Sequence, residues 1–244
     1  MKIIIVNDAR DVGVKAAELV VKEVIKKKNL VLGLATGGTV IPFYRSLVGL
    51  VKNKKIDFSY IRSFNLDEYV GLNKKDKRSF YYFMNKNFFS KVSIWMRNVY
   101  FLNGMAKNLD VECKEYEEGI NNIGGIDLQI LGIGRDGHIG FNEPGSSLKS
   151  KTREVLLSDI TRKDNVKFFS GEIKKVPKRA LTMGISTIFG AKKIILLACG
   201  EGKAEIVHRF LHGEISEEVP ASFLRRHKDF IVILDKEAAS ELKN

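Results

Sequence analysis

Residues 132–144, with the sequence GIGRDGHIGFNEP, bring two acids and a histidine together in one glycine-rich segment. The acids are Asp136 and Glu143, and His138 lies between them. Carboxylates can hold an imidazole in one tautomer, and the imidazole can then accept and release protons near neutral pH. The glycines let the backbone bend sharply and leave room for a ligand beside the main chain. An ordinary turn has no use for a histidine with two acids, so we expect this histidine loop to perform acid/base chemistry.

A second glycine-rich segment consists of Thr36, Gly37, Gly38 and Thr39 and stands where a helix is expected to begin. The free N–H groups and the positive dipole end of a helix attract anions, and the threonine hydroxyls add donors. Lys203, near the start of a later helix, could add a full positive charge. The segment is neither a Walker A loop nor a GxGxxG fingerprint. We therefore expect it to bind the phosphate of a small molecule rather than ATP or NAD.

The elements that must position these loops alternate along the chain. Short apolar runs predict strands near residues 2–6, 30–35, 60–65, 99–102, 126–131, 193–199 and 229–234, with a further short strand at 153–157. Helical spacing predicts helices within 12–24 and near 39–53, 79–91, 109–122, 160–167, 178–188 and 202–211, followed by a terminal helix. This alternation is typical of the α/β class, with a mainly parallel sheet covered by helices on both faces.

The length of 244 residues would allow one domain or two smaller ones. Because no repeat or linker is evident, we expect a single domain over residues 1–244. In such a sheet, ligands bind outside the carboxyl ends of the strands. Residues 36–39, the triplet 67–69 (Asp-Glu-Tyr), the histidine loop and residues 200–203 each follow a predicted strand. We expect these four segments to meet at one edge of the sheet.

The net charge of +12 could indicate binding of nucleic acid, binding of an anionic small substrate, or only a lysine-rich surface. The lysines are scattered, and their runs fall at the predicted ends of elements and in loops. No helix-turn-helix or aromatic-basic platform is evident. A solvated surface is therefore favoured, and nucleic-acid binding is a weak alternative.

The sequence gives no indication of export or membrane insertion. No apolar run reaches the length of a membrane span, and the start, residues 1–6, runs into charged residues too soon for a signal peptide. Cys113 and Cys199 lie far apart and without a CxxC or Cys/His pattern, so we expect two reduced thiols and no zinc. We expect a cytoplasmic protein.

Five segments along the chain form a set of motifs: residues 34–39 (LATGGT), 64–72 (FNLDEYVGL), 131–144 (LGIGRDGHIGFNEP), 177–184 (PKRALTMG) and 202–204 (GKA). In this order they resemble the successive motifs of the glucosamine-6-phosphate deaminase family. The match spans nearly the whole chain, and the histidine loop is its most specific part. The resemblance implies a single Rossmann-like α/β domain that converts D-glucosamine 6-phosphate and water to D-fructose 6-phosphate and ammonia. It also implies catalysis without a metal or an organic cofactor.

The same resemblance implies roles for the acids and the histidine. His138, oriented by Asp136 and Glu143, would open the sugar ring. Asp67 would carry the proton from C2 to C1, and partial burial would raise its pKa and suit it to this task. Its neighbour Glu68 is the local competitor. Adjacent side chains of a strand point opposite ways, so only one of the two can face the sugar.

For the phosphate, the pattern carries over to the segment 36–39, Lys203 and Lys167. Lys167 stands where we would expect arginine, and this difference replaces a bidentate fork by a point charge. We expect weaker phosphate affinity as a result.

A second departure concerns the regulatory site of the hexameric members, which N-acetylglucosamine 6-phosphate activates. Ser146 and Arg153 match that site, but Val155 replaces a lysine, and the sequence stops at Asn244, before the C-terminal segment that those enzymes use. We expect no allosteric activation, and a monomer or weak homo-oligomer.

Three alternatives compete with this interpretation. A galactosamine-6-phosphate deaminase would need the same acids and histidine and would differ only in the recognition of C4. A 6-phosphogluconolactonase would share the fold but needs no base at C2, and the motifs at 65–69 and 141–144 count against it. A sugar-phosphate-sensing regulator would carry a DNA-binding extension and lack the acid/base residues, and neither holds for this sequence.

Overall fold

The apolar runs of the sequence form the strands of a seven-stranded sheet in the computed structural model, which describes residues 1–242. Its strands are β1 (Lys2–Val6), β2 (Val31–Leu34), β3 (Arg62–Asn65), β5 (Val99–Tyr100), β6 (Leu128–Gly132), β9 (Lys193–Ala198) and β10 (Phe230–Asp235). Their order is β1-β10-β9-β6-β2-β3-β5, and every pair is parallel. Because both faces of a parallel sheet are covered, its central strands are largely buried, as the apolar run of β2 illustrates.

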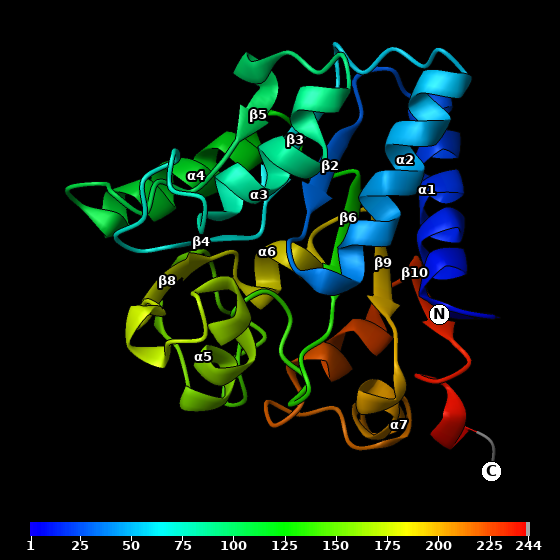
Figure 1. The fold of residues 1–244 in the computed structure, drawn as a ribbon, viewed down its shortest axis with the longest axis vertical. Helices are drawn as coiled ribbons and strands as arrows, with labels where there is room; N and C mark the ends of the chain where they lie inside the picture. Colours follow the sequence, from blue (N-terminus) through cyan, green and yellow to red (C-terminus); the bar gives the residue numbers. More distant parts are fainter. Residues whose placement is uncertain (243–244) are drawn as a thin grey trace.

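The helices pack around the two sheets (Figure 1). They are α1 (Ala9–Lys26), α2 (Ile41–Asn53), α3 (Phe80–Asn87), α4 (Leu109–Asn122), α5 (Asp159–Asn165), α6 (Ile185–Phe189) and α7 (Ala204–His212). Figure 1 shows α1 and α2 side by side against one face of the sheet and α4 on its other side. On that side Tyr116 of α4 packs against Phe64 of β3. The predicted α/β class, with a mainly parallel sheet between helices, is confirmed.

Short 3-10 helices fill several connections. They are η1 (Gly38–Val40), η2 (Phe89–Lys91), η3 (Met96–Asn98), η4 (Val166–Phe168), η5 (Ile173–Lys175), η6 (Glu201–Lys203), η7 (Pro220–Arg226) and η8 (Ser240–Leu242). The predicted terminal helix is wrong, because the chain after β10 makes turns and then only η8. The carboxylate of Asp235 accepts the N–H of Ala238 and holds the first of these turns. Residues 243 and 244 lie outside the described part.

A second, three-stranded antiparallel sheet was not expected. It consists of β4 (Asp67–Tyr69), β8 (Arg179–Thr182) and β7 (Arg153–Leu156), in the order β4-β8-β7. The strand predicted at 153–157 is thus confirmed, but the helix predicted over 178–188 is wrong, since it contains β8 and leaves only α6. Pairing with a strand on each side outweighs the helical propensity of this segment.

The small sheet joins two segments that carry chemically useful residues. Asp67 pairs with Thr182 across β4 and β8. The Thr182 hydroxyl also accepts the N–H of Phe141 in the histidine loop, and Asn142 of that loop donates to the carbonyl of Met183. β8 therefore fixes the histidine loop beside the strand of Asp67.

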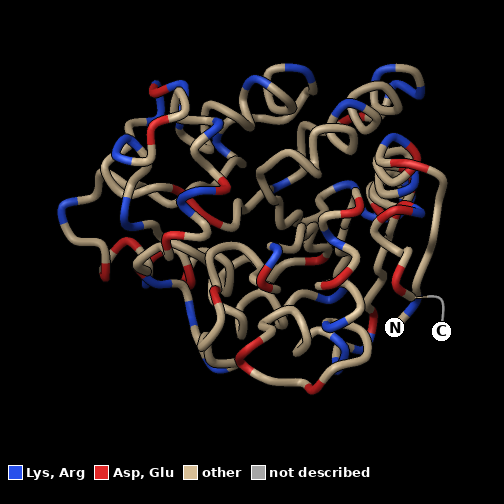
Figure 2. The backbone as a smooth tube through the Cα atoms, turned by 60° about the horizontal axis from the view of Figure 1, so that its bottom comes forward, with Lys and Arg blue, Asp and Glu red and all other residues tan. Residues whose placement is uncertain are grey.

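Charge and hydropathy follow the sequence-based expectation. Lysine and arginine are spread over the molecule (Figure 2). This spread favours a solvated basic surface over a single stripe that binds nucleic acid.

In residues 1–242, no helix combines the length and the apolarity that crossing a membrane requires.

Candidate active site

A pocket of about 820 Å³ opens at the carboxyl ends of the parallel strands. In Figure 1 these strands run downward, towards the part of the molecule that holds β8 and α5. The predicted residues that line the pocket are Thr36, Gly37, Gly38, Thr39, Asp67, His138, Lys167 and Lys203. These residues come from five separate stretches of the chain. The expected meeting of loops at one edge of the sheet is therefore present.

The segment 36–39 forms the start of a helix. Gly37 has a φ of 108°, which favours glycine, and it precedes η1, which continues into α2. The first N–H groups of a helix have no partner within the helix. Together with the helix dipole they make this end of the pocket suitable for an anion.

Cationic side chains surround the same pocket. The lysines and arginines in its lining are Lys77, Arg78, Arg135, Lys163, Lys167 and Lys203, and the acids are Asp67 and Asp164. Burial lowers the pKa of Lys203, and the charges of Arg135 and Lys167 lower it further against the opposing effect of Asp164. The pocket is therefore electropositive and suited to a phosphorylated ligand.

Asp67 is the buried acid of the pocket. Its side chain is only 5% exposed, and within residues 1–242 its Oδ1 atom has no hydrogen-bond partner. Burial, and then the charge of Glu68, raises the pKa of Asp67 to about 8. A carboxyl group in such surroundings can hold a proton near neutral pH and exchange it with a ligand.

Glu68 occupies the other side of β4. Its carboxylate accepts the N–H groups of Tyr69, Phe80 and Tyr81, the last two at the start of α3. Burial raises the pKa of Glu68, and these three N–H groups oppose that rise. Glu68 thus fixes α3, and it is not among the residues that line the pocket.

His138 is held by Asp136. The Nδ1 atom of His138 lies 2.7 Å from Oδ1 of Asp136, which also accepts the backbone N–H of His138. Burial acts to raise the pKa of Asp136, but the hydrogen bond and charge of His138 hold it below its ordinary value. A proton on Nδ1 leaves Nε2 as the acceptor.

Gly134 makes this arrangement possible. A Cβ atom at this position would overlap the imidazole ring of His138. The N–H of Gly134 also donates to the carbonyl of His138 and closes the loop. Only glycine fits between the backbone and the ring.

Glu143 is placed differently from the other predicted residues. Its carboxylate accepts the N–H of Ser158, the N-terminal cap of α5, at 3.0 and 3.1 Å. Within residues 1–242 no hydrogen bond joins it to His138. It connects the histidine loop to the α5–η4 segment, which carries Lys167.

Sequence reasoning missed several residues of the pocket. Tyr69 lies two positions after Asp67 and so faces the same side of β4. Its hydroxyl is buried and, within residues 1–242, has no hydrogen-bond partner. Alternation along the strand could have identified it. Arg135 and Arg78 also line the pocket. Arg135 was inside the recognised motif, whereas no sequence signal marked Arg78.

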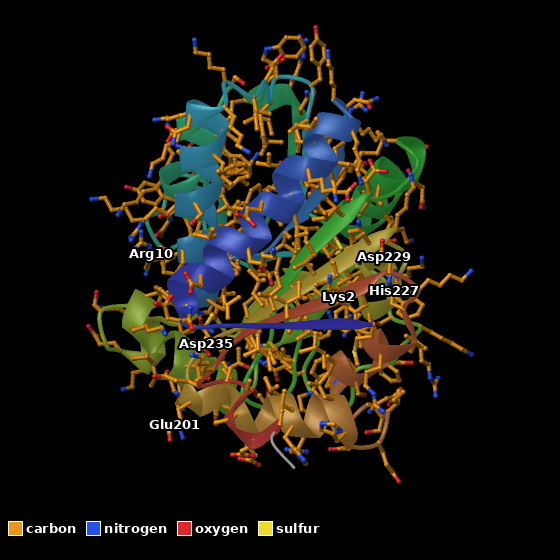
Figure 3. All side chains as sticks on the ribbon, turned by 90° about the vertical axis from the view of Figure 1, so that its right-hand side faces the viewer. Lys2, Arg10, Glu201, His227, Asp229 and Asp235 are labelled. Carbon is orange, nitrogen blue, oxygen red and sulfur yellow. The ribbon has the colours of Figure 1, made fainter. Side chains whose placement is uncertain are left out.

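His227 lies far from the pocket. Figure 3 shows it with Lys2 and Asp229 at the amino ends of β1 and β10, whereas Asp235 and Glu201 lie at the opposite end of the sheet. Its Nδ1 atom accepts the N–H of Asp229, and its Nε2 atom lies 2.7 Å from the carbonyl of Ala191. His227 therefore stabilises the far edge of the sheet. Across residues 1–242 no cluster of three or more His, Cys, Asp or Glu side chains could hold a metal ion.

Comparisons with known proteins agree with this geometry. The family model described as glucosamine-6-phosphate isomerases/6-phosphogluconolactonase matches residues 7–232. A curated relative from Clostridium botulinum, named glucosamine-6-phosphate deaminase, is 50% identical over 243 residues and covers 100% of this chain and 99% of its own length. A relative of the same name from a Thermoanaerobacter species is 48% identical over 240 residues, which is 98% of this chain and 94% of the relative.

Two solved structures are similar to this chain over almost its full length. A structure described as a monomeric glucosamine-6-phosphate deaminase is 44% identical, with a TM-score of 0.97, and covers 99% of this chain and 100% of its own. The 6-phosphogluconolactonase from Trypanosoma cruzi is 22% identical, with a TM-score of 0.77 and coverage of 100% and 97%. At that identity the second likeness shows the fold alone.

Proposed function

The chain belongs to the glucosamine-6-phosphate isomerase and 6-phosphogluconolactonase family, and we propose that it is a glucosamine-6-phosphate deaminase. It converts D-glucosamine 6-phosphate and water to D-fructose 6-phosphate and ammonia. One observation carries the choice within the family: the buried carboxyl group of Asp67 and the imidazole of His138 line one electropositive pocket. A lactonase has no need of a base at C2, whereas an aldose-to-ketose conversion requires one.

Ring opening is the task of His138. The proton on the anomeric hydroxyl must leave and the ring oxygen must gain one. With Nδ1 facing Asp136, the free Nε2 atom takes up the first proton and delivers it to the ring oxygen. Asp136 stabilises the imidazolium formed in between, because its own charge persists at neutral pH. Glu143 acts as a positioning residue through Ser158 and α5.

The open-chain sugar then needs one proton moved from C2 to C1. Asp67 removes the C2 proton, which gives an enolamine, and returns a proton to C1, which gives an imine at C2. Water adds to this imine, and ammonia leaves. The buried site of Asp67 suits both halves of this transfer, because a pKa of about 8 lies close to working pH.

The phosphate is bound at the other end of the pocket. Residues 36–39 supply N–H groups and hydroxyls, and Lys203 and Lys167 supply charge. The partial burial of Lys203 strengthens its attraction for an anion, since less water screens the charge. These contacts fix C1 and C2 of the sugar between Asp67 and His138.

A monomer without allosteric activation is proposed as the working form. The 44% identical solved relative is described as monomeric. Arg153 donates to Asn142 and Ser146 in this chain, and Val155 adds no charge beside it. A sugar phosphate is a cytoplasmic metabolite, so we also propose a cytoplasmic location.

Ammonia release by the purified protein tests the proposal. Glucosamine 6-phosphate and galactosamine 6-phosphate are compared at equal concentration, with and without a chelator, and fructose 6-phosphate formation is measured in parallel. We expect ammonia and fructose 6-phosphate in equal amounts from the gluco epimer, unaffected by the chelator. Faster turnover of the galacto epimer would reassign the substrate. Hydrolysis of 6-phosphogluconolactone without ammonia release from either amino sugar would contradict the proposal.

A further inference from the structure

Arg135 has no part in the chemistry described so far, although it lines the pocket. It directly precedes Asp136 in the histidine loop. A Cβ atom added to Gly202 would lie 4.0 Å from Nη2 of Arg135, so the guanidinium lies beside η6, the short helix that carries Lys203. The arginine therefore reaches from the histidine loop towards the phosphate end of the pocket.

The guanidinium has no acidic partner. Within residues 1–242 no carboxylate lies within 4.0 Å of it, and no hydrogen bond from its nitrogens is present. Arg78, which also lines the pocket, is by contrast paired with Asp76. Arg135 thus keeps all five of its donors available.

Arg135 also adds to the electrostatic repulsion among the cations of the pocket, which a bound anion would relieve. Its charge and that of Lys167 both act against the charge of Lys203, which is largely withdrawn from water, while Asp164 and Asp136 act in the opposite direction. The three cations repel one another. A phosphate dianion bound between these three side chains would attract each of them and offset the repulsion.

We propose that Arg135 binds the phosphate group of the substrate and supplies the bidentate fork that Lys167 lacks. This inference rests on the proposed function, which places the phosphate at this end of the pocket. Lys167 is a point charge, whereas a guanidinium offers two parallel N–H donors to two phosphate oxygens. Arg135 therefore compensates for the lysine, and phosphate affinity depends on an arginine from a different loop.

The test compares Arg135→Gln, Arg135→Lys and a matched control, Arg10→Gln. Arg10 is an exposed arginine in the first turn of α1 and does not line the pocket, so the control makes the same change away from the pocket. We measure KM and kcat for glucosamine 6-phosphate and the binding of inorganic phosphate by calorimetry. Circular dichroism melting verifies the fold of each variant.

Loss of a charge-assisted contact should weaken binding by roughly 10- to 100-fold. Arg135→Gln should show this loss both in KM and in phosphate affinity, with kcat within about threefold of the wild type. Arg135→Lys should be intermediate, and Arg10→Gln should leave both values unchanged. An Arg135→Gln variant that binds phosphate as well as Arg10→Gln does would overturn the proposal. If Arg135→Lys bound phosphate with wild-type affinity, the proposed bidentate contact of the guanidinium would be overturned.

Calorimetry keeps this result separate from the proposed reaction. If the wild-type protein released no ammonia from either amino sugar, the proposed function would fail. Phosphate binding by the wild type and by Arg135→Gln would still be measurable and would decide the role of Arg135.

Discussion

Asp67 and Glu68 are adjacent in β4, yet their carboxylates lie in opposite surroundings. The Asp67 side chain lines the pocket, and its Oδ1 atom has no hydrogen-bond partner within residues 1–242. Glu68 accepts three backbone N–H groups and fixes α3. The alternation of side chains along a strand thus directs one acid to the pocket and the other to the backbone of α3. The charge of Glu68 still reaches Asp67 and helps to keep its pKa high.

The first prediction concerns the pH dependence of kcat/KM. Asp67 must be ionised to remove the C2 proton, so activity should rise with pH through an acid limb near pH 8. Glu68→Gln removes the neighbouring negative charge and should move this limb to lower pH. Rate profiles between pH 5 and 10 give the position of the acid limb in the wild type and in Glu68→Gln. The substrate's own ionisations are the same for both proteins and do not contribute to the difference. An identical limb in the variant would show that Asp67 does not control it.

The second prediction concerns stability. The pKa of Asp67 is about 8 in the folded protein, against an ordinary value of 3.8. Folding therefore favours the protonated form, and this contribution to stability is present below pH 3.8 and is lost as pH rises to about 8. Asp67→Asn cannot ionise, so its advantage over the wild type in free energy of unfolding should grow through this window, at no more than about 1.4 kcal/mol per pH unit. Thermal melts between pH 5 and 9 measure it, and a constant or shrinking difference would contradict the assignment.

The third prediction concerns the tautomer of His138. Asp136→Asn replaces an acceptor by a group that can donate to Nδ1, which frees the imidazole to take the wrong tautomer. We expect kcat to fall by about 10²-fold or more, with little change in phosphate affinity. Steady-state kinetics and phosphate calorimetry provide the comparison. If only KM rose, Asp136 would have a binding role instead.

The fourth prediction concerns regulation. Val155 leaves Arg153 and Ser146 without the lysine of the regulatory pattern. Initial rates should therefore depend hyperbolically on glucosamine 6-phosphate, and N-acetylglucosamine 6-phosphate should not activate. A sigmoidal curve that this acetylated sugar turns hyperbolic would refute the prediction.

The positions of the loops could be predicted from sequence, because each follows an apolar strand of the parallel sheet. This rule placed Thr36, Asp67, His138 and Lys203 at one edge without any knowledge of pairing. The small sheet could not be predicted in this way. The segment around β8 has helical propensity, and only its long-range pairing with β4 and β7 makes it a strand.

The contacts of individual side chains were harder to foresee. The motif grouped Glu143 with His138, but a carboxylate in a loop binds the nearest free N–H groups, and here that group belongs to Ser158. Arg135 could not be assigned from the sequence, because its position beside η6 depends on the packing of two separate loops. Sequence spacing gives proximity along the chain, whereas these contacts depend on how separate loops pack.

The most direct measurement is the rate of ammonia release from glucosamine 6-phosphate by Asp67→Asn. Asp110→Asn is the matched control, since Asp110 is an exposed acid in the first turn of α4 and does not line the pocket. We predict that Asp67→Asn loses about 10²- to 10⁴-fold in kcat while it still binds inorganic phosphate, and that Asp110→Asn keeps the wild-type rate. Retention of more than about a tenth of the wild-type rate by Asp67→Asn would contradict a general base at this position.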